Sequence, residues 1–210
     1  MPILIHPVSD TELHRATTIE TAAYASNALN PILFPGPFPP DSHQQRVDQL
    51  ISLRRDDPTA TYTQAIDTAS GRMIAFAKWH IYSTPEESRV PSRKMEFGTG
   101  TNAEACNLFF GSMAKRKEGI VGSRPHVYLH MLHTDPAHQR HGAGSALMAH
   151  IKQKADALDL PIYLESSADA HGFYLQQGFK DVEILILDFS GVGAVERYEQ
   201  PLMMRGAVGD

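Results

Sequence analysis

A glycine-rich turn stands directly before an amphipathic stretch in the C-terminal half of the chain. The turn reads QRHGAG at 139–144, and apolar residues recur at helical spacing over 143–158. Gly142 and Gly144 allow the backbone to approach a ligand closely, and the first N–H groups of a helix have no partner within it. Such a turn can hold an anion, to which Arg140 could add a positive charge. The first question is which anion this turn would bind.

Three kinds of phosphate-binding turn can be compared with this stretch. A P-loop requires a lysine after its last glycine, whereas Ser145 and Ala146 follow Gly144 here. A dinucleotide-binding turn requires a third glycine, and Leu147 occupies that position. The third kind needs Gln or Arg, two further residues and then Gly-x-Gly or Gly-x-Ala between a strand and a helix, which 139–144 provides. A turn that merely begins a helix is the alternative interpretation.

The element before the turn is predicted to be a central strand over 127–134. Its two faces are expected to carry Val127, Leu129 and Met131 on one side, and Tyr128, His130 and Leu132 on the other. Both faces are largely apolar, as in a strand that helices cover on both sides.

The remaining elements predict a mixed α/β fold with an antiparallel first half and a parallel centre. Further strands are expected at 3–6, 61–67, 72–82, 161–166, 182–189 and 197–205, and further helices from Ser9, from Asp41, at 102–117 and at 169–177. The proline-rich 30–40 and the polar 83–100 are expected to lack regular structure. We expect one domain over 1–210, with an insertion at about 83–117.

Composition limits the class of protein. The chain has 210 residues, 42% of them hydrophobic and 20% charged, which is ordinary for a globular domain. Its net charge of −5 argues against a general nucleic-acid binder, and no apolar run approaches the ~20 residues of a membrane span. The single cysteine, Cys106, allows no internal disulfide, and no signal peptide is visible. We therefore expect a cytoplasmic protein with neither nucleic acid nor membrane as partner.

Two motifs in order resemble those of the GNAT superfamily of acyl-CoA N-acyltransferases. LHTDPAHQRHGAGSALM at 132–148 is similar to the family's central motif, in which a strand leads into the loop that binds the coenzyme A pyrophosphate. YLESS at 163–167 and FYLQQGF at 173–179 are similar to its next motif. The spacing between the motifs is also typical of the family. The resemblance implies a GNAT-type fold, a central mixed sheet with splayed parallel central strands flanked by helices.

The resemblance also implies a coenzyme A site. The pantetheine arm would lie between the splayed strands 127–134 and 161–166, where it would pair with backbone groups of the first. The pyrophosphate would be held by the loop, mainly through N–H groups. The residues implied in binding acetyl-CoA or coenzyme A are Leu132, His133, Thr134, Gln139, Arg140, His141, Gly142, Ala143, Gly144 and Ser145.

Direct attack of an amine on a thioester requires a base and an acid. The resemblance places Tyr174 at the family's general-acid position, where a phenol could protonate the leaving thiolate. His130 is our candidate base, because an imidazole can accept a proton at neutral pH. His130 falls where arylalkylamine N-acetyltransferases carry a catalytic histidine. The second catalytic histidine of those enzymes aligns with Tyr128, so the sequence does not support a relay of two histidines. A packed histidine without a catalytic role is the alternative, and other family members use a remote carboxylate, for which Glu20 and Glu165 are candidates.

Metal binding and covalent catalysis are not expected. Among the histidines, His130 and His133 are expected on opposite faces of their strand, and no carboxylate pattern accompanies them. Cys106 lies on the apolar face of its predicted helix, where burial is the default. The helix at 102–117 is most simply core or dimer surface.

The acceptor is the least defined part of the prediction. We expect a small-molecule amine or a peptide amine, entering beside Phe34, Phe38 and Glu20, with the insertion as a cover. The function predicted is N-acetyl transfer from acetyl-CoA to a primary amine. A non-catalytic acyl-CoA-binding or sensing domain is the alternative, and a nicotinamide-dependent oxidoreductase is excluded by Leu147. Relatives often pair through late strands, so a homodimer through 182–205 is a further expectation.

Overall fold

The computed structural model describes residues 2–89, 96–192 and 197–206. Its strands are β1 (Ile3–Pro7), β2 (Ala60–Asp67), β3 (Arg72–Tyr82), β4 (His126–Thr134), β5 (Ile162–Glu165), β6 (Lys180–Leu187) and β7 (Tyr198–Arg205). Its α-helices are α1 (Leu13–Tyr24), α2 (Asn30–Leu33), α3 (Ser42–Asp56), α4 (Pro85–Ser88), α5 (Ala103–Cys106), α6 (Ser112–Val121), α7 (Ala143–Ala157) and α8 (Ala168–Gln176). The mixed α/β fold class predicted from the sequence is confirmed.

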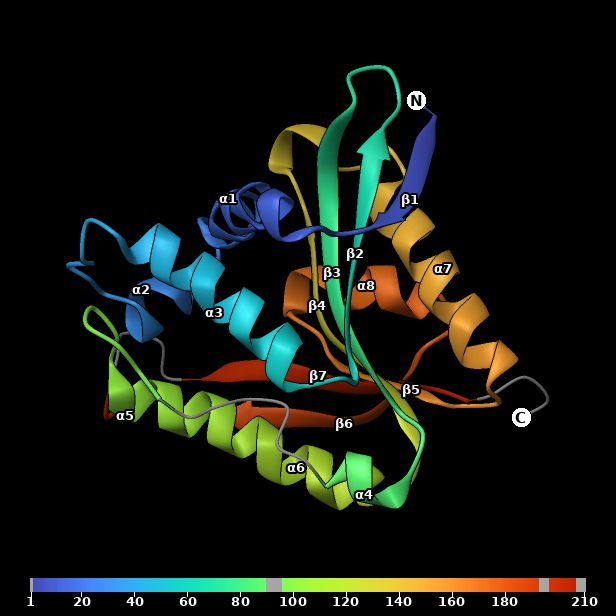
Figure 1. The fold of residues 1–210 in the computed structure, drawn as a ribbon. Coiled ribbons are helices and arrows are strands. Elements are labelled where there is room, and N and C mark those ends of the chain that lie inside the picture. The colour runs from blue at the N-terminus through green and yellow to red at the C-terminus, as the bar shows by residue number, and fades with distance from the viewer. Residues whose placement is uncertain (1, 90–95, 193–196, 207–210) are drawn as a thin grey trace.

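One sheet connects the seven strands of the described residues, in the order β1-β2-β3-β4-β5-β7-β6. Among these strands only β4 and β5 pair in parallel, and every other neighbouring pair is antiparallel. Figure 1 shows β6 and β7 running across the direction of β2 and β3. The parallel pair at the centre is therefore the place where the two halves of the sheet turn away from each other.

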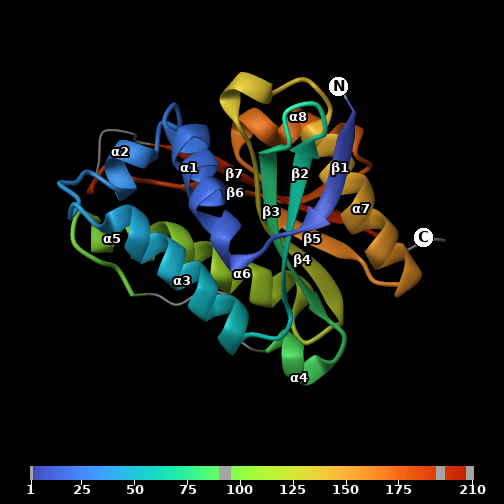
Figure 2. The same cartoon turned by 45° about the horizontal axis from the view of Figure 1, so that its top comes forward.

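Helices cover the two faces of the sheet with separate apolar cores (Figures 1 and 2). On one face, α7 buries Leu147, Ile151 and Ala155 against strands β2 to β5. On the other face, α1 and α3 pack on Phe76 and Met131. This division gives β4 the two apolar faces that its sequence predicts.

Three local departures from the sequence predictions have simple causes. Residues 30–33 form the short helix α2, because Pro31 stands at a first-turn position where a missing N–H costs nothing. Within the expected loop 83–100, Thr84 caps the short helix α4. Leu158, expected to be buried at the end of its helix, lies beyond α7 and is half exposed.

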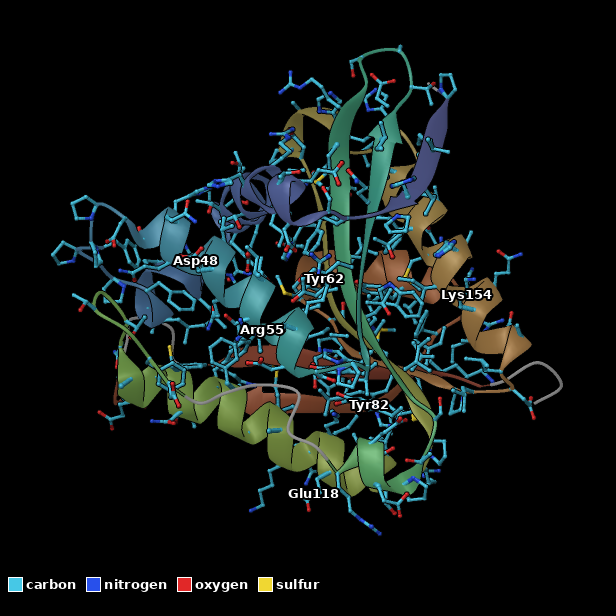
Figure 3. The ribbon with its side chains drawn as sticks, in the orientation of Figure 1. Asp48, Arg55, Tyr62, Tyr82, Glu118 and Lys154 are labelled. Atoms are coloured by element: carbon cyan, nitrogen blue, oxygen red, sulfur yellow. The ribbon has the colours of Figure 1, made fainter. Side chains whose placement is uncertain are left out.

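The expected insertion forms a layer along β6 and β7. Its residues 90–95 lie outside the described part of the chain, and α5, a π-helical segment at Asn107–Gly111 and α6 follow without a break. Arg116 of α6 forms an ion pair with Glu183 of β6. Glu118 of α6 and Lys154 of α7 point away from the sheet in Figure 3, as expected for the outer sides of covering helices.

Cys106 is fully buried, and burial raises the pKa of its thiol to about 11. A protonated, buried thiol is a poor nucleophile, in agreement with the structural role expected for it. In the described ranges, no helix is both long and apolar enough to cross a membrane.

Candidate functional site

The central strands β4 and β5 separate after a short paired stretch. Their last parallel pair joins Leu129 to Leu164, while β4 stays paired with β3 as far as Thr134. Beyond Leu129, therefore, β4 presents to β5 an edge that no described strand covers. His130 and Glu165 are the first residues past the last pair, at the base of the gap. His130 and Glu165, the two candidate bases predicted on these strands, therefore lie at the same level of the sheet.

A β-bulge lies at the same point. Lys78 of β3 pairs with Met131, and Trp79 pairs with Leu129, so His130 is the extra residue. The bulge turns Met131 to the face covered by α1 and α3, and Leu132 packs toward α7. The strict alternation expected over 127–134 is therefore wrong beyond Leu129, because one extra residue reverses the faces that follow it.

The glycine-rich turn has the backbone conformation of a helix-start anion site. Gly142 caps α7 with φ of 91°, in the left-handed region that a side chain would strain. Arg140 also has a positive φ, of 64°, and its side chain is exposed. The hydrogen bonds of α7 begin only with the Ala146 N–H, which donates to the Gly142 carbonyl at 2.9 Å. The earlier N–H groups are therefore available to an anion.

An ion pair holds the start of this turn. Asp135 accepts a hydrogen bond from the Ala137 N–H at 3.0 Å and pairs with Arg15 of α1. Arg15 also donates from Nε to the Met73 carbonyl at 3.1 Å. The turn is thus fixed to α1 and β3 at once. Sequence spacing could not have found Arg15, because it lies 120 residues from Asp135.

Tyr174 lies on α8 and packs in the core that α7 shares with β4 and β5. Ser167 caps this helix, and the Tyr174 ring contacts Phe179 edge-on at 5.7 Å between centroids. Only 7% of Tyr174 is exposed. Burial raises the pKa of its hydroxyl, and Tyr24 of α1 acts in the same direction. The phenol therefore keeps its proton at neutral pH, as a proton donor must.

Glu20 lies close to the site but is already engaged. Arg46 donates to both of its carboxylate oxygens, at 2.8 Å and 3.0 Å. Burial alone would raise the pKa of Glu20, but the charge and hydrogen bonds of Arg46 outweigh it and lower that pKa. His133 packs beside this pair, with its ring 4.8 Å from that of Tyr24. Burial lowers the pKa of His133, so its ring is neutral.

Aromatic contacts surround His130. Its ring stacks on that of Tyr128 at 5.1 Å between centroids, with 21° between the planes. Tyr128 donates its hydroxyl proton to Glu165 Oε2 at 2.7 Å. His130 and Glu165 are thereby connected across the base of the gap. Tyr128 occupies the position at which the resemblance would place a second histidine. It contacts both candidate bases, His130 through its ring and Glu165 through its hydroxyl group.

The two phenylalanines expected near the acceptor lie in different environments. Phe34 packs against Phe110 of the π-helical segment, with 6.5 Å between ring centroids. Phe38 is 51% exposed and lies beside Gly100. An aromatic wall next to Phe34 is formed by Phe97, Phe109 and Phe110 of the segment predicted to be an insertion, whereas Phe38 lies at the surface.

The histidines of this region do not form a metal site. His130 and His133 lie on the same face of the sheet, so the expectation of opposite faces is wrong; the bulge is the reason. Across the described residues, no group of three or more His, Cys, Asp or Glu side chains could hold a metal ion.

Comparison with known proteins agrees with this geometry. Residues 28–179 match the acetyltransferase (GNAT) family. The chain belongs to that family. A search of the curated proteins finds no match.

Solved structures of GNAT proteins share the fold over nearly the whole chain. A histone acetyltransferase HPA2-related protein from Corynebacterium glutamicum has a TM-score of 0.60 at 18% identity, covering 100% of this chain and 99% of that one. A mosquito arylalkylamine N-acetyltransferase has 0.63 at 13%, covering 98% and 100%. A phosphinothricin acetyltransferase from Sinorhizobium meliloti in complex with AcCoA has 0.61 at 12%, covering 99% and 89%. At these identities the likeness concerns the fold.

Proposed function

We propose that this GNAT protein is an N-acetyltransferase that moves an acetyl group from acetyl-CoA to a primary amine. The observation that carries the proposal is the uncovered edge of β4, which begins at the bulge at His130 and continues to Thr134, before the turn at Gly142 that starts α7. An extended thioester needs an anchor for its phosphates, an open strand edge for its arm and a donor for its carbonyl. The turn, the edge and the bulge are the three features that we propose for these roles.

The binding part of the proposal rests on backbone groups. N–H groups of 140–145 hold the pyrophosphate, and Gln139 and Arg140 flank it. Backbone groups of Leu132, His133 and Thr134 form hydrogen bonds to the pantetheine arm along the open edge of β4. The backbone at the bulge polarises the acetyl carbonyl, because a bulge turns an N–H group away from the neighbouring strand.

The chemical part assigns one proton to each of two side chains. His130 takes a proton from the ammonium form of the acceptor, which leaves the nitrogen able to attack the carbonyl carbon. The C–N bond forms and the C–S bond breaks. Tyr174 gives its hydroxyl proton to the leaving thiolate, for which a neutral phenol is suited.

The acceptor is a small primary amine or a peptide amine that approaches from the α1–α3 side. Phe34 and the aromatic wall of the insertion provide apolar contacts there. Glu20 pairs with Arg46 and does not bind the amine, because the carboxylate already accepts two hydrogen bonds. Phe38, at the surface, marks the outer rim.

Calorimetric titration with acetyl-CoA, coenzyme A and NADH tests the binding part. We expect both coenzyme A species to bind and NADH not to bind. Gly142→Asp is expected to abolish binding, because it adds a strained side chain and a negative charge at the turn. Gly71→Asp is the matched control: it adds the same charge at a glycine with φ of 69° in an exposed hairpin turn.

Thiol release tests the chemical part, with 2-phenylethylamine, L-lysine, spermidine and an alanine-initiated peptide as acceptors. Release with any of them supports the transferase. Coenzyme A binding without release from the whole panel supports the alternative, an acyl-CoA-binding domain without turnover. Absence of coenzyme A binding overturns both interpretations.

A homodimer through 182–205 stays a prediction. β6 is an edge strand, and its apolar residues Val182, Ile184 and Ile186 are 38–49% exposed. An uncovered apolar edge of this kind favours association.

A further inference from the structure

A buried histidine–carboxylate pair lies on the same face of the sheet as His130. His80 of β3 is 1% exposed, and its Nδ1 lies 3.2 Å from Asp57 Oδ2 and 3.1 Å from Thr59 Oγ1. An ionised carboxylate only accepts hydrogen bonds, so Nδ1 carries the proton and donates it to Asp57. This tautomer leaves the lone pair on Nε2, inside the protein.

The second nitrogen of His80 faces the interior near His130. Within the described part of the chain, His80 Nε2 is buried and makes no hydrogen bond. The rings of His80 and His130 lie 5.7 Å apart between centroids, tilted by 32°. This separation suits one water molecule between two ring nitrogens, since such a bridge is nearly as favourable as a direct bond. A buried polar atom without a protein partner calls for an explanation of this kind.

The charges around His80 keep it neutral but able to accept a proton. Burial lowers the pKa of His80, and Lys78 and Lys117 lower it further, whereas Asp57 raises it. The groups that face this region from the packed elements are Lys78 and Tyr82 of β3, His126, Tyr128 and His130 of β4, Lys117 of α6, and Asp57 at the end of α3. Positive charges next to the ring favour rapid release of any proton that it receives.

The pair also reaches the protein surface. Asp57 ends α3, and Thr59 lines a surface hollow together with Pro58, Ser83 and Glu87. Thr59 donates its hydroxyl proton to Asp57 Oδ1 at 2.6 Å. A line of polar groups thus runs from the base of the β4–β5 gap to solvent on the far side of β3.

We propose that His80, held by Asp57, is the proton exit of the transferase. The proposal rests on the proposed function. The N–H bond of the acceptor ammonium breaks and its proton goes to His130, then through a bridging water to His80 Nε2. The Nδ1 proton of His80 leaves by way of Asp57 and Thr59 to bulk water, so both rings return to neutrality with the His80 proton on Nε2. After the product has left, the Nε2 proton passes to water in the open gap and Nδ1 takes up a proton from solvent through Asp57, which restores the starting tautomer. The acceptor nitrogen loses a second proton after the C–N bond forms. This proton replaces the one that Tyr174 gives to the thiolate.

His80 and Asp57 are thus positioning residues that act through His130. The simpler role for such a pair is to fasten the end of α3 to β3. The two roles differ in one respect. A fastening role affects stability or substrate affinity, whereas a proton exit determines how the rate depends on pH and on added buffer.

The test compares His80→Asn with His126→Asn. Asn at 80 can still donate to Asp57 but cannot pass a proton from one nitrogen to the other. His126 is equally buried in the same region, and its Nδ1 donates to the Arg124 carbonyl, away from His130. Coenzyme A affinity by calorimetry and the pH profile of kcat are measured for both variants, with the best acceptor of the wild-type panel.

We expect His80→Asn to bind coenzyme A as the wild type does. Its kcat is expected to fall about 10- to 100-fold near neutral pH, the range of one proton-transfer step. The loss is expected to shrink at higher pH and on addition of imidazole, because a small base can then remove the proton. Asp57→Asn is expected to show the same pattern more weakly. His126→Asn is expected to keep the wild-type profile.

A loss in His80→Asn that neither pH nor imidazole changes overturns the proton exit and leaves the transferase intact. A pH profile of His80→Asn that matches that of His126→Asn does the same. If the wild type binds coenzyme A without releasing thiol to any amine, or does not bind it, the proposed function fails and the exit with it. Thiol release by the wild type distinguishes failure of the exit from failure of the proposed function, and calorimetry then shows whether coenzyme A binds.

Discussion

The environment of Tyr174 decides what this side chain can do. A phenol on the surface would exchange its proton with water, whereas Tyr174 lies among Phe173, Phe179 and the end of α1. Burial raises its pKa, so the proton stays on the oxygen at neutral pH. In the proposed reaction, the base that takes this proton is the thiolate that departs as the C–S bond breaks.

Replacement of Tyr174 by phenylalanine tests this role at the residue scale. Tyr174→Phe is expected to lower kcat about 100-fold with little change in the Kd for coenzyme A, because only the proton donor is removed. Steady-state thiol release and calorimetry measure the two quantities. Tyr62→Phe is the control, since it removes another buried hydroxyl, which donates to the Leu50 carbonyl at 2.9 Å. It should cost about 1 kcal/mol of unfolding free energy and leave kcat unchanged. Equal kcat for Tyr174→Phe and wild type would refute the assignment.

Residues within the sequence motifs could be predicted, but their partners could not. The turn at 139–144 and Tyr174 follow from local patterns, and they lie at the start of α7 and on α8. Arg15, Arg46 and His80 reach the site from other elements, and nothing in their sequence neighbourhoods marks them. Contacts that depend on how helices and strands pack cannot be predicted from the spacing of residues within one segment.

At the scale of elements, the connection between β4 and α7 depends on its attachment to α1. Asp135 begins this connection and pairs with Arg15, and both side chains are mostly buried. In the turn that follows, Arg140 and His141 are exposed, and His141 contacts the local Gln139 carbonyl at 2.7 Å. Because Asp135 is held by Arg15, the N–H groups of the following turn can adopt fewer positions.

Asp135→Asn is expected to weaken coenzyme A binding about fivefold, which corresponds to about 1 kcal/mol for a partly buried charged pair. The amide keeps a cap for the Ala137 N–H but leaves Arg15 without its opposite charge. Asp156→Asn is the matched control, because Asp156 pairs with Arg205 at the other end of α7 with similar exposure. Calorimetry should show normal coenzyme A affinity for this control. Equal affinities for both variants would show that the ion pair does not position the turn.

Element order was predictable and the bulge was not. Hydrophobic patterning predicted the seven strands of the described residues, because each strand carries apolar residues. The short helices α2 and α4 were missed, since their caps are only local signals. The bulge at His130 depends on how β3 and β4 pair over their full length, so a single strand does not reveal it.

At the scale of the whole molecule, several buried histidines connect stability to pH. Burial lowers the pKa of His126 from 6.5 to about 4, opposed by its hydrogen bond to Arg124. His80 and His133 are also lowered, with burial as the main cause. Between about pH 4 and pH 6.5, the unfolded chain therefore binds more protons at these histidines than the folded chain does. The free energy of unfolding therefore falls as pH drops through this window.

Urea unfolding measures this effect. We expect the wild type to lose on the order of 2 kcal/mol or more between about pH 6.5 and about pH 4.5. His126→Phe should make the loss smaller, because it keeps a ring against Tyr82 and removes one titrating group. His14→Asn, at an exposed position, is the control and should leave the slope unchanged. A stability that does not change over this range would contradict the direction of these pKa shifts.

The extra residue in β4 means that the count of residues in this strand matters as much as their identity. Deleting His130 would remove the candidate base and the bulge together, but Met131 would stay opposite Lys78, so Leu132 would keep the α7 side and His133 its place beside Tyr24. Deleting Met131 while the bulge stays would instead bring Leu132 opposite Lys78 and exchange the faces of everything that follows. His130 can thus be removed without exchanging the faces beyond it. The proposed base therefore stands at a position that the packing of the strand does not require.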